Sequence, residues 1–247
     1  MSAFRESVVS SFRPAAMLRA AALCTALTAL NLGASPTVQA QASGGQDQAA
    51  MRAQAEAGMR QHYATRTAEH ARDTAHRDIV MLGDSLIEGN NWQAAFPKVS
   101  LANRGIGGDT TEGMLRRLDT VQKLKPAKVF LMAGINDLSW YGRPVTEVFQ
   151  QYSRLIDALG RGGARVYVQS TLKVGPLFPS QTNVAVAALN EQLRGYCNRG
   201  HCRYIDLNPI LAPQGVLAQD YTYDQLHLTP AAYEKWVHAI RSAITSP

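Results

Sequence analysis

The chain has 247 residues, of which 46% are hydrophobic and 18% are charged. These values are typical of a soluble globular protein, and the length suits one sizeable domain with a tail better than two domains. The formal net charge is +6, but the sequence contains no block of lysines and arginines of the kind that binds nucleic acid. The composition therefore predicts a single-domain protein with no nucleic-acid partner.

Residues 1–40 have the pattern of an export signal. Three arginines precede an apolar stretch at residues 20–30, and small residues then lead to Ala40. The apolar stretch is too short to span a bilayer comfortably. We therefore predict a signal peptide cleaved after Ala40, a periplasmic or secreted protein, and no stable membrane span after cleavage. A leader retained as an N-terminal anchor is the alternative.

The segment from residue 41 to residue 77 divides into two parts. Residues 41–50 are rich in glutamine, alanine, glycine and serine, which predicts a flexible linker. Residues 51–77 are rich in alanine, arginine, glutamate and glutamine with scattered apolar positions, which predicts a helix.

Two of the three cysteines lie close together. Cys24 falls in the leader, whereas Cys197 and Cys202 flank a short polar segment that contains His201. In an exported protein two nearby cysteines favour a disulfide. A metal site at His201 would need more ligands than this neighbourhood offers. We therefore predict a Cys197–Cys202 disulfide and no metal site.

From residue 78 onward, short apolar runs alternate with stretches of helical character. The predicted strands are Ile79–Leu82, Val99–Ala102, Val129–Ala133, Val166–Gln169 and Tyr204–Leu207. The predicted helices are Leu86–Phe96, Thr111–Lys123, Val145–Gly160, Val184–Asn198 and Pro230–Ile244, the last with Thr229 as its N-cap. Strands that alternate with helices predict an α/β domain over residues 78–247, in which helices cover both faces of a mostly parallel sheet.

Ser85 lies just after the first predicted strand, in the sequence Gly-Asp-Ser-Leu at residues 83–86. Open α/β sheets gather their ligands at the carboxyl ends of the strands, so this serine is a candidate nucleophile. A serine hydroxyl needs an adjacent base at neutral pH. His227 is the candidate base, and Asp224, three residues earlier, is the candidate carboxylate that orients its ring.

Two further motifs offer donors for an oxyanion. Gly-Ile-Gly-Gly-Asp at residues 105–109 follows the second strand, and glycine tolerates backbone shapes that would turn the Gly108 N–H toward a ligand. Asp109 and Glu112 resemble a capping box, which places a helix start here. Gly-Ile-Asn-Asp at residues 134–137 follows the third strand, where the Asn136 amide is a candidate donor.

Each motif alone has an ordinary explanation, since Gly-Asp-Ser and Asn-Asp are common in turns. The glycine-rich loop lacks the lysine of a P-loop. Residue 87 is isoleucine, which excludes the Gly-x-Ser-x-Gly elbow of α/β-hydrolases. The combination is more informative, because three motifs follow strands of one sheet and the fourth precedes the last helix.

Together the four motifs resemble those of the SGNH hydrolase superfamily, the GDSL-type esterases and lipases. The stretch at residues 105–111 looks closest to the platelet-activating-factor acetylhydrolase-like branch. The resemblance implies a flavodoxin-like three-layer α/β/α sandwich with a mostly parallel five-stranded sheet. It implies Ser85 as nucleophile, His227 as base and Asp224 as its partner. It also implies an oxyanion hole made by the N–H groups of Ser85 and Gly108 and the Asn136 amide, with no cofactor.

Aromatic residues near these motifs are candidates for the substrate pocket. Trp140 and Tyr141 follow the Asn136 motif, and the loop at residues 175–180 follows the fourth strand as a candidate rim or lid. Five histidines outside the four motifs, among them His62 and His70, are expected at the surface.

The prediction for function is a serine ester hydrolase with a small-molecule or glycan ester as substrate. Short-chain or acetyl esters, including O-acetylated carbohydrate, are the first choice. A lysophospholipase or thioesterase that acts on longer acyl chains is the alternative within the enzyme class. Because a fold does not fix a function, a non-catalytic glycan- or lipid-binding protein of the envelope is the alternative outside it.

Overall fold

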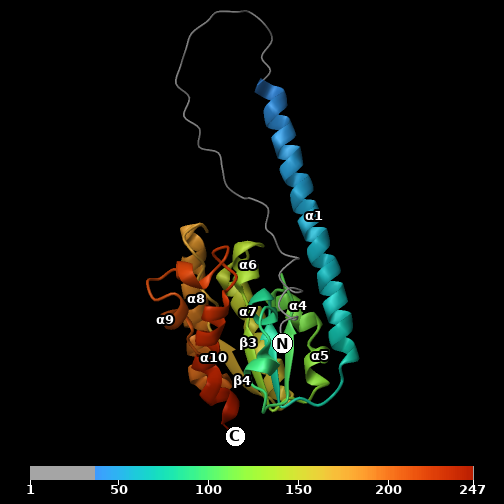
Figure 1. Cartoon of the computed structure of the whole chain (residues 1–247), viewed down its shortest axis with the longest axis vertical. Helices are drawn as coiled ribbons and strands as arrows, with labels where there is room; N and C mark the ends of the chain where they lie inside the picture. Colours follow the sequence, from blue (N-terminus) through green and yellow to red (C-terminus); the bar gives the residue numbers. More distant parts are fainter. Residues whose placement is uncertain (1–36, 247) are drawn as a thin grey trace, which may run out of the picture. The chain divides into compact units, whose positions relative to one another are not determined.

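The computed structural model describes residues 37–246 (Figure 1). The predicted leader lies outside the described residues except for residues 37–40. Helix α1 spans Thr37–Arg72 and therefore includes residues 41–50, where the sequence predicted a flexible linker. Alanine and glutamine, which favour helix, outnumber glycine in that stretch. One compact unit begins at Gln48, well before residue 78.

A five-stranded sheet forms the centre of this unit. Its strands are β1 (Ile79–Gly83), β2 (Leu101–Gly105), β3 (Lys128–Met132), β4 (Arg165–Gln169) and β5 (Arg203–Ile205). They lie in the order β2-β1-β3-β4-β5 and every neighbouring pair is parallel. This is the flavodoxin-like order, in which the chain winds first to one side of β1 and then to the other. The predicted fold class is confirmed.

The helices of the unit lie on both faces of the sheet (Figure 1). After α1 they are α2 (Ser85–Glu88), α3 (Trp92–Ala95), α4 (Thr111–Arg116), α5 (Asp119–Gln122), α6 (Ile135–Ser139), α7 (Val145–Arg161), α8 (Ser180–Tyr196), α9 (Asn208–Leu211) and α10 (Pro230–Thr245). A π turn, η2 (Cys197–His201), and a 3-10 turn, η3 (Gln219–Tyr221), complete the described elements.

Two predicted helices are each interrupted. The stretch predicted as Leu86–Phe96 forms α2 and α3, because Asn91 starts a new helix by accepting a hydrogen bond from Ala94 N at 3.1 Å. The stretch predicted as Thr111–Lys123 likewise forms α4 and α5. The interruption after Glu88 leaves Ser85 at the start of a single short turn of helix.

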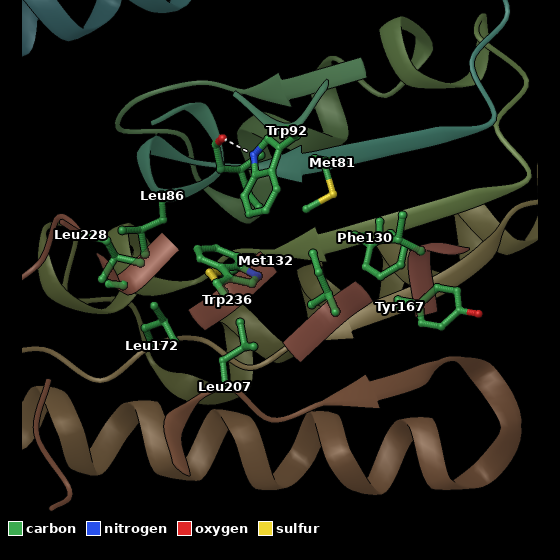
Figure 2. Packing of buried hydrophobic residues seen from close by; sticks show 14 of the residues in the cluster. Met81, Leu86, Trp92, Phe130, Met132, Tyr167, Leu172, Leu207, Leu228 and Trp236 are labelled. Atoms are coloured by element: carbon green, nitrogen blue, oxygen red, sulfur yellow. Dashed lines mark hydrogen bonds between the residues drawn. The ribbon is translucent and has the colours of Figure 1, made fainter. Parts of the chain in front are cut away.

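Alternate side chains along the strands pack into two separate cores. Ile79 and Met81 of β1 face one core, and Val80 and Leu82 face the other. The first core contains Trp92 and the buried face of α10, where the Trp92 and Trp236 rings meet edge to face with centroids 5.1 Å apart (Figure 2). The second core contains the buried faces of α7 and α8. Two cores on opposite faces make the three-layer sandwich.

β2 continues beyond the predicted end at Ala102 because its polar residues find partners. The Asn103 side chain donates to the carbonyl of Ile87 at 3.0 Å and accepts from Gly105 N at 2.8 Å. The Arg104 side chain, 4% exposed, reaches Asp73 Oδ2 at 3.0 Å. Hydrogen bonding of this kind removes the cost of burying polar groups in a strand.

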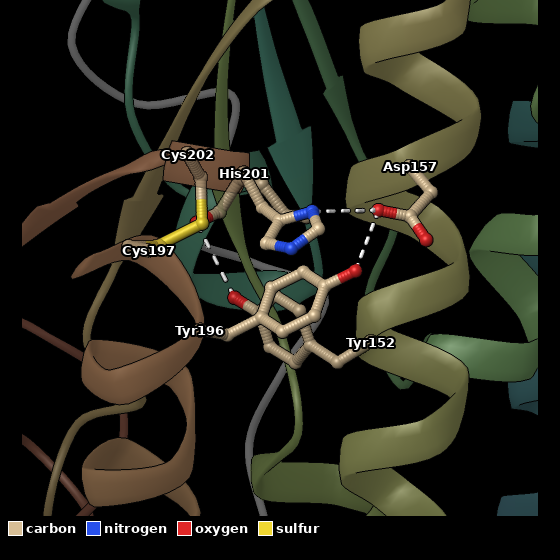
Figure 3. The surroundings of a disulfide bond; sticks show 7 residues. Tyr152, Asp157, Tyr196, Cys197, His201 and Cys202 are labelled. Carbon is tan, nitrogen blue, oxygen red and sulfur yellow. Dashed lines mark hydrogen bonds and ion pairs between the residues drawn. A yellow bond between two sulfur atoms is a disulfide. The ribbon is translucent and has the colours of Figure 1, made fainter. Parts of the chain in front are cut away.

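The Cys197–Cys202 disulfide predicted from the sequence is present in the structure (Figure 3). It closes the π turn after α8, in which Gly200 adopts the left-handed backbone at φ 95°. His201 stacks on the Tyr196 ring with centroids 4.0 Å apart, and the Tyr196 hydroxyl donates to Asp157 Oδ1 at 2.6 Å. The turn leads into the start of β5, so the disulfide belongs to the amino end of the sheet.

Candidate active site

The carboxyl ends of β1, β2 and β3 are level with one another. Gly83 is the last residue of β1, and its partners in register are Gly105 on one side and Met132 on the other. The segments that follow these three residues carry the first three sequence motifs. Parallel register therefore brings motifs that are distant in sequence to one edge of the sheet, at the point where the winding changes direction.

A continuous chain of hydrogen bonds joins Ser85, His227 and Asp224. His227 Nε2 lies 3.0 Å from Ser85 Oγ, and His227 Nδ1 lies 2.6 Å from Asp224 Oδ2. Ser85 is the first residue of α2, whose N-cap is Asp84. The geometry allows the ring to accept the serine proton while its other nitrogen donates to the carboxylate.

The loop at residues 221–229 carries both Asp224 and His227. Thr222 and Leu228 form an antiparallel bridge across its base. Between them Gln225 has a positive φ of 74°, which is uncommon for a residue with a side chain. This conformation lets the Asp224 carboxylate accept from the backbone N–H of His227 at 2.7 Å as well as from its ring. The tight loop thus fixes the acid against the base.

The environment shifts the pKa values of His227 and Asp224 in opposite directions. Burial alone would lower the pKa of His227, but the hydrogen bond and the negative charge of Asp224 outweigh it, so the pKa is raised. Burial alone would raise the pKa of Asp224, but its hydrogen bonds with His227 outweigh it, so the pKa is lowered. Both shifts favour an ionised carboxylate beside a readily protonated imidazole.

The loop at residues 105–109, which we call the oxyanion loop after the role that the sequence predicts for it, is held by its neighbours. Gly108 adopts φ 75°, a conformation that glycine takes without strain. The Asn136 side chain donates to the carbonyl of Asp109 at 2.9 Å, which leaves its second N–H for another acceptor. One side chain therefore links the third motif to the second.

Asp109 is paired in a way that the sequence did not indicate. Its carboxylate accepts from Arg117 Nε at 2.7 Å, and the same guanidinium donates to the carbonyl of Gly83 at 3.1 Å. Burial raises the pKa of Asp109 to about 6, although Arg117 acts in the opposite direction. Arg117 thus ties the oxyanion loop to the strand that ends at the serine motif.

The prediction that Asp109 and Glu112 form a capping box at the start of α4 is wrong. The N-cap of α4 is Thr110, whose hydroxyl accepts from Gly113 N at 3.1 Å. Asp109 is instead engaged by Arg117, and Glu112 by Arg116 and Arg143. A buried partner eight residues away competes successfully for the carboxylate, and the short threonine side chain takes over the cap.

Asp84 and Asp137 are buried next to the site. Asp84 caps α2 by accepting from Leu86 N at 3.0 Å, and burial raises its pKa to about 7. Asp137 accepts from both the backbone N–H and the hydroxyl of Thr111 and pairs with Arg143 at 3.0 Å. Asp84 therefore makes a local contact with the backbone of its own turn, whereas Asp137 connects α6 with α4.

Exposed apolar side chains extend from the loops at this edge of the sheet. Trp140 and Tyr141, which follow Asn136 in sequence, are 41% and 53% exposed. Leu177, in the loop after β4, is 65% exposed, and Tyr223, next to Asp224, is 72% exposed. We call these four residues the apolar rim. The exposure of these side chains to solvent would allow them to contact a substrate.

The expectation that His70 lies at the surface is wrong, because its side chain is only 4% exposed.

The described residues contain no cluster of three or more histidine, cysteine, aspartate or glutamate side chains arranged to hold a metal ion. Within the same part of the chain, no helix combines the length and hydropathy required to cross a bilayer.

Comparison with known proteins places these features in a family. The sequence model of the GDSL-like Lipase/Acylhydrolase family matches residues 81–235. Rat platelet-activating factor acetylhydrolase IB subunit alpha1 is 29% identical over 178 residues, which cover 68% of this chain and 75% of the rat protein.

Solved structures agree on the fold. A Streptococcus pneumonia protein named for platelet activating factor superposes with a TM-score of 0.71 at 23% identity, covering 79% of this chain and 99% of that one. A GDSL-like lipase from Bacteroides thetaiotaomicron gives a TM-score of 0.64 at 22% identity, with 74% and 96% covered. The chain belongs to the GDSL-like lipase/acylhydrolase family within the SGNH hydrolases, and it is a carboxylic ester hydrolase.

Proposed function

We propose that the chain hydrolyses short-chain or acetyl esters through an acyl-enzyme formed on Ser85. The observation that carries this proposal is the hydrogen-bonded chain from Asp224 through His227 to Ser85, with its distances of 2.6 Å and 3.0 Å. Family membership supports ester hydrolysis in general. The assignment of individual residues to steps rests on the geometry of the site.

In the first half of the reaction, Ser85 Oγ attacks the ester carbonyl carbon while its proton passes to His227 Nε2. The carbonyl oxygen becomes an oxyanion, which the N–H groups of Ser85 and Gly108 and the Asn136 amide stabilise. Asp224 stabilises the imidazolium. When the tetrahedral intermediate collapses, the bond to the leaving oxygen breaks and His227 protonates the departing alcohol.

In the second half, water takes the place of the alcohol. His227 removes a proton from the water as it attacks the acyl carbon, and the same donors stabilise the second oxyanion. Collapse releases the carboxylic acid, and the proton held by His227 returns to Ser85. The protein groups named here account for every proton, so the proposed mechanism uses no cofactor.

An acetyl or other short acyl group is proposed as the portion transferred. The rat relative, with which the chain shares 29% identity, is named as an acetylhydrolase. We propose a small-molecule or glycan ester as the substrate, with O-acetylated carbohydrate as one candidate. The polar side chains beside the rim, such as Arg143 with its guanidinium 5.4 Å from the Tyr141 ring, suit a hydroxylated alcohol portion.

The variant Ser85→Ala tests the proposal. It should abolish hydrolysis of p-nitrophenyl acetate and labelling by a fluorophosphonate, while circular dichroism and thermal unfolding remain those of the wild type. Turnover that persists in Ser85→Ala would contradict the assignment. A series of p-nitrophenyl esters with increasing acyl length, run beside acetylated sugars, would then identify the acyl and alcohol portions.

A specific observation favours longer acyl chains as the alternative. The apolar rim exposes Leu177 and Tyr223 to more than half of their maximum, and apolar side chains of this kind contact acyl chains favourably. If catalytic efficiency rises from acetyl to octanoyl esters, the enzyme is better described as a lysophospholipase or thioesterase.

We also propose that the protein is exported and cleaved after Ala40. Cleavage at this point would leave intact the compact unit, which begins at Gln48. Fractionation of the cells of origin and mass measurement of the N-terminal peptide test this proposal. Recovery of the uncleaved chain from the cytoplasm would contradict it.

A further inference from the structure

Helix α1 contacts the oxyanion loop, although it lies outside residues 81–235 that match the family. Met59, His62, Tyr63 and Arg66 are spaced along one face of the helix and are partly buried. Tyr63 donates its hydroxyl proton to the carbonyl of Gly113 in α4 at 2.9 Å. The helix therefore packs on the part of the domain that follows β2.

Glu88 connects this helix to the loop. Its Oε2 accepts a hydrogen bond from the backbone N–H of Gly107 at 2.6 Å. His62 Nε2 lies 2.9 Å from the same oxygen, and Arg66 Nε lies 2.9 Å from Oε1. The three side chains are 21% to 31% exposed, so the pairs are partly shielded from water.

Glu88 is also close to the nucleophile in the chain. It is the last residue of α2, which begins at Ser85. A β-carbon at Gly105 would lie 2.2 Å from Glu88 N, so α2 lies directly against the end of β2. Any movement of Glu88 is therefore transmitted both to the serine turn and to the oxyanion loop.

The loop needs an external restraint because of its composition. Gly105, Gly107 and Gly108 lose much conformational freedom when they are fixed in place. A carboxylate that accepts from Gly107 N–H forms a charge-assisted hydrogen bond, which is stronger than a neutral one. On the next residue, a β-carbon at Gly108 would lie 3.1 Å from Met59 Sδ, so α1 also limits the space beside Gly108.

We propose that Glu88 is a positioning residue for ester hydrolysis. Held by His62 and Arg66 of α1, its carboxylate fixes the Gly107 peptide and thereby the adjoining Gly108 N–H. The inference rests on the proposed role of Gly108 as an oxyanion donor. It makes His62 and Arg66 of α1 positioning residues for ester hydrolysis as well, because they act through Glu88.

Four variants of the full-length protein test the inference. Glu88→Ala removes the contact with Gly107, and Glu88→Gln keeps an acceptor for that N–H but removes the charge. The double variant His62→Ala/Arg66→Ala removes the support from α1. Gln61→Ala, an exposed position on the same helix, is the matched control. Fluorophosphonate titration gives the concentration of active sites in each preparation.

The expected result is a loss in kcat with little change in KM for p-nitrophenyl acetate. Displacement of catalytic groups by about 1 Å can cost up to about 100-fold, so we expect kcat of Glu88→Ala to fall by roughly tenfold or more. Glu88→Gln should recover most of this loss, and Gln61→Ala should match the wild type. The kcat of His62→Ala/Arg66→Ala should also fall. Combining this double variant with Glu88→Ala should lower kcat little further, because both changes act through one contact.

A trifluoromethyl ketone supplies a readout that a purely structural role would not change. The ketone forms a hemiketal with the serine, and its oxygen occupies the oxyanion position. Its inhibition constant should rise by the same factor as kcat/KM falls in Glu88→Ala. If Glu88→Ala does not fold, the same comparison between wild type and His62→Ala/Arg66→Ala decides the question.

Two results would overturn the inference: a kcat of Glu88→Ala within about twofold of wild type, or ketone affinity unchanged while kcat falls. The Ser85→Ala variant keeps the two proposals separate. If Ser85→Ala is inactive while the Glu88 variants are fully active, only the positioning role fails. If Ser85→Ala is active, the proposed function itself is wrong.

Discussion

The Gln225 side chain occupies the space that a β-carbon at Gly175 would need. Such an atom would lie 2.0 Å from Gln225 Oε1 and 2.9 Å from Gln225 Cβ. The backbone also joins the two residues, since Gly175 N donates to the carbonyl of Gln225 at 2.7 Å. The loop after β4 therefore interlocks with the loop that carries Asp224 and His227.

Gly175→Ala should impair catalysis without a change in any group that reacts. The new methyl group displaces Gln225, whose left-handed backbone places the Asp224 carboxylate against His227. We expect kcat/KM to fall by about 10- to 100-fold, since misplacement of catalytic groups has effects of this size. Gly160→Ala in α7 is the control, because a β-carbon there has open space, and it should leave kcat/KM unchanged. Equal activity of the two variants would contradict the interlock.

The activity should depend on pH through His227. The base must be neutral to accept the serine proton, so kcat/KM should rise with pH through the pKa of His227. Because Asp224 raises this pKa above its ordinary value of 6.5, the midpoint of the acidic limb should lie above that value. Asp224→Asn should move the midpoint downward and reduce kcat by about 10³- to 10⁴-fold. A pH–rate profile in which the limb does not move would exclude the pair as its origin.

Asn136→Ala tests the side-chain donor of the oxyanion hole. One N–H of the amide is used by the carbonyl of Asp109, and the other is proposed to bind the oxyanion. Loss of one such donor costs about 10²- to 10³-fold in kcat. Ser139→Ala, on the same helix, removes only a bond to the carbonyl of Ile135 and should stay close to wild type. Steady-state kinetics with p-nitrophenyl acetate measures this loss in kcat. A much smaller loss would show that the Asn136 amide does not bind the oxyanion.

Arg117→Met should destabilise the fold, and more strongly at alkaline pH. The substitution leaves Asp109, 2% exposed, without its buried partner, a change that costs about 3–5 kcal/mol. Without Arg117, the pKa of Asp109 should rise further from about 6. A carboxyl whose pKa is higher in the folded than in the unfolded state loses stability as pH rises, so the cost should grow between about pH 5 and pH 8.

Denaturant unfolding at the two pH values measures this effect. Arg116→Met is the matched control, because its pair with Glu112 is exposed and such pairs contribute at most about 1 kcal/mol. The double variant Asp109→Asn/Arg117→Met should recover part of the loss, since no buried carboxyl remains to ionise. A cost that is equal at both pH values would show that packing of the Arg117 side chain, rather than the charge of Asp109, dominates.

The sequence predicts best what depends on neighbouring residues. β1 and β3 lie close to their predicted limits because their apolar runs are uninterrupted. The sequence singled out Ser85 through a short motif at a strand end, and Asp224 and His227 through a short motif before the last helix. β2 was predicted to end at Ala102 but extends to Gly105, because the partners of Asn103 and Arg104 come from other elements.

What the sequence could not predict are pairs of ordinary residues brought together by folding. Asp109 with Arg117 and Glu88 with His62 have no characteristic spacing, since the latter pair is joined across 26 residues. His70 is 4% exposed, and burial together with the positive charges of nearby arginines lowers its pKa to about 3. Only tertiary structure places a positive Arg104 and Arg117 beside it.

The position of the Cys197–Cys202 bond separates it from the chemistry. The disulfide closes a turn at the amino end of β5, whereas Ser85 follows the carboxyl end of β1, and these ends lie at opposite edges of the parallel sheet. Reduction should therefore leave turnover intact while it loosens one corner of the fold. Because disulfides form and persist in oxidising compartments and are rare in the cytosol, the redox state of this pair in freshly isolated protein tests the proposed export of the chain.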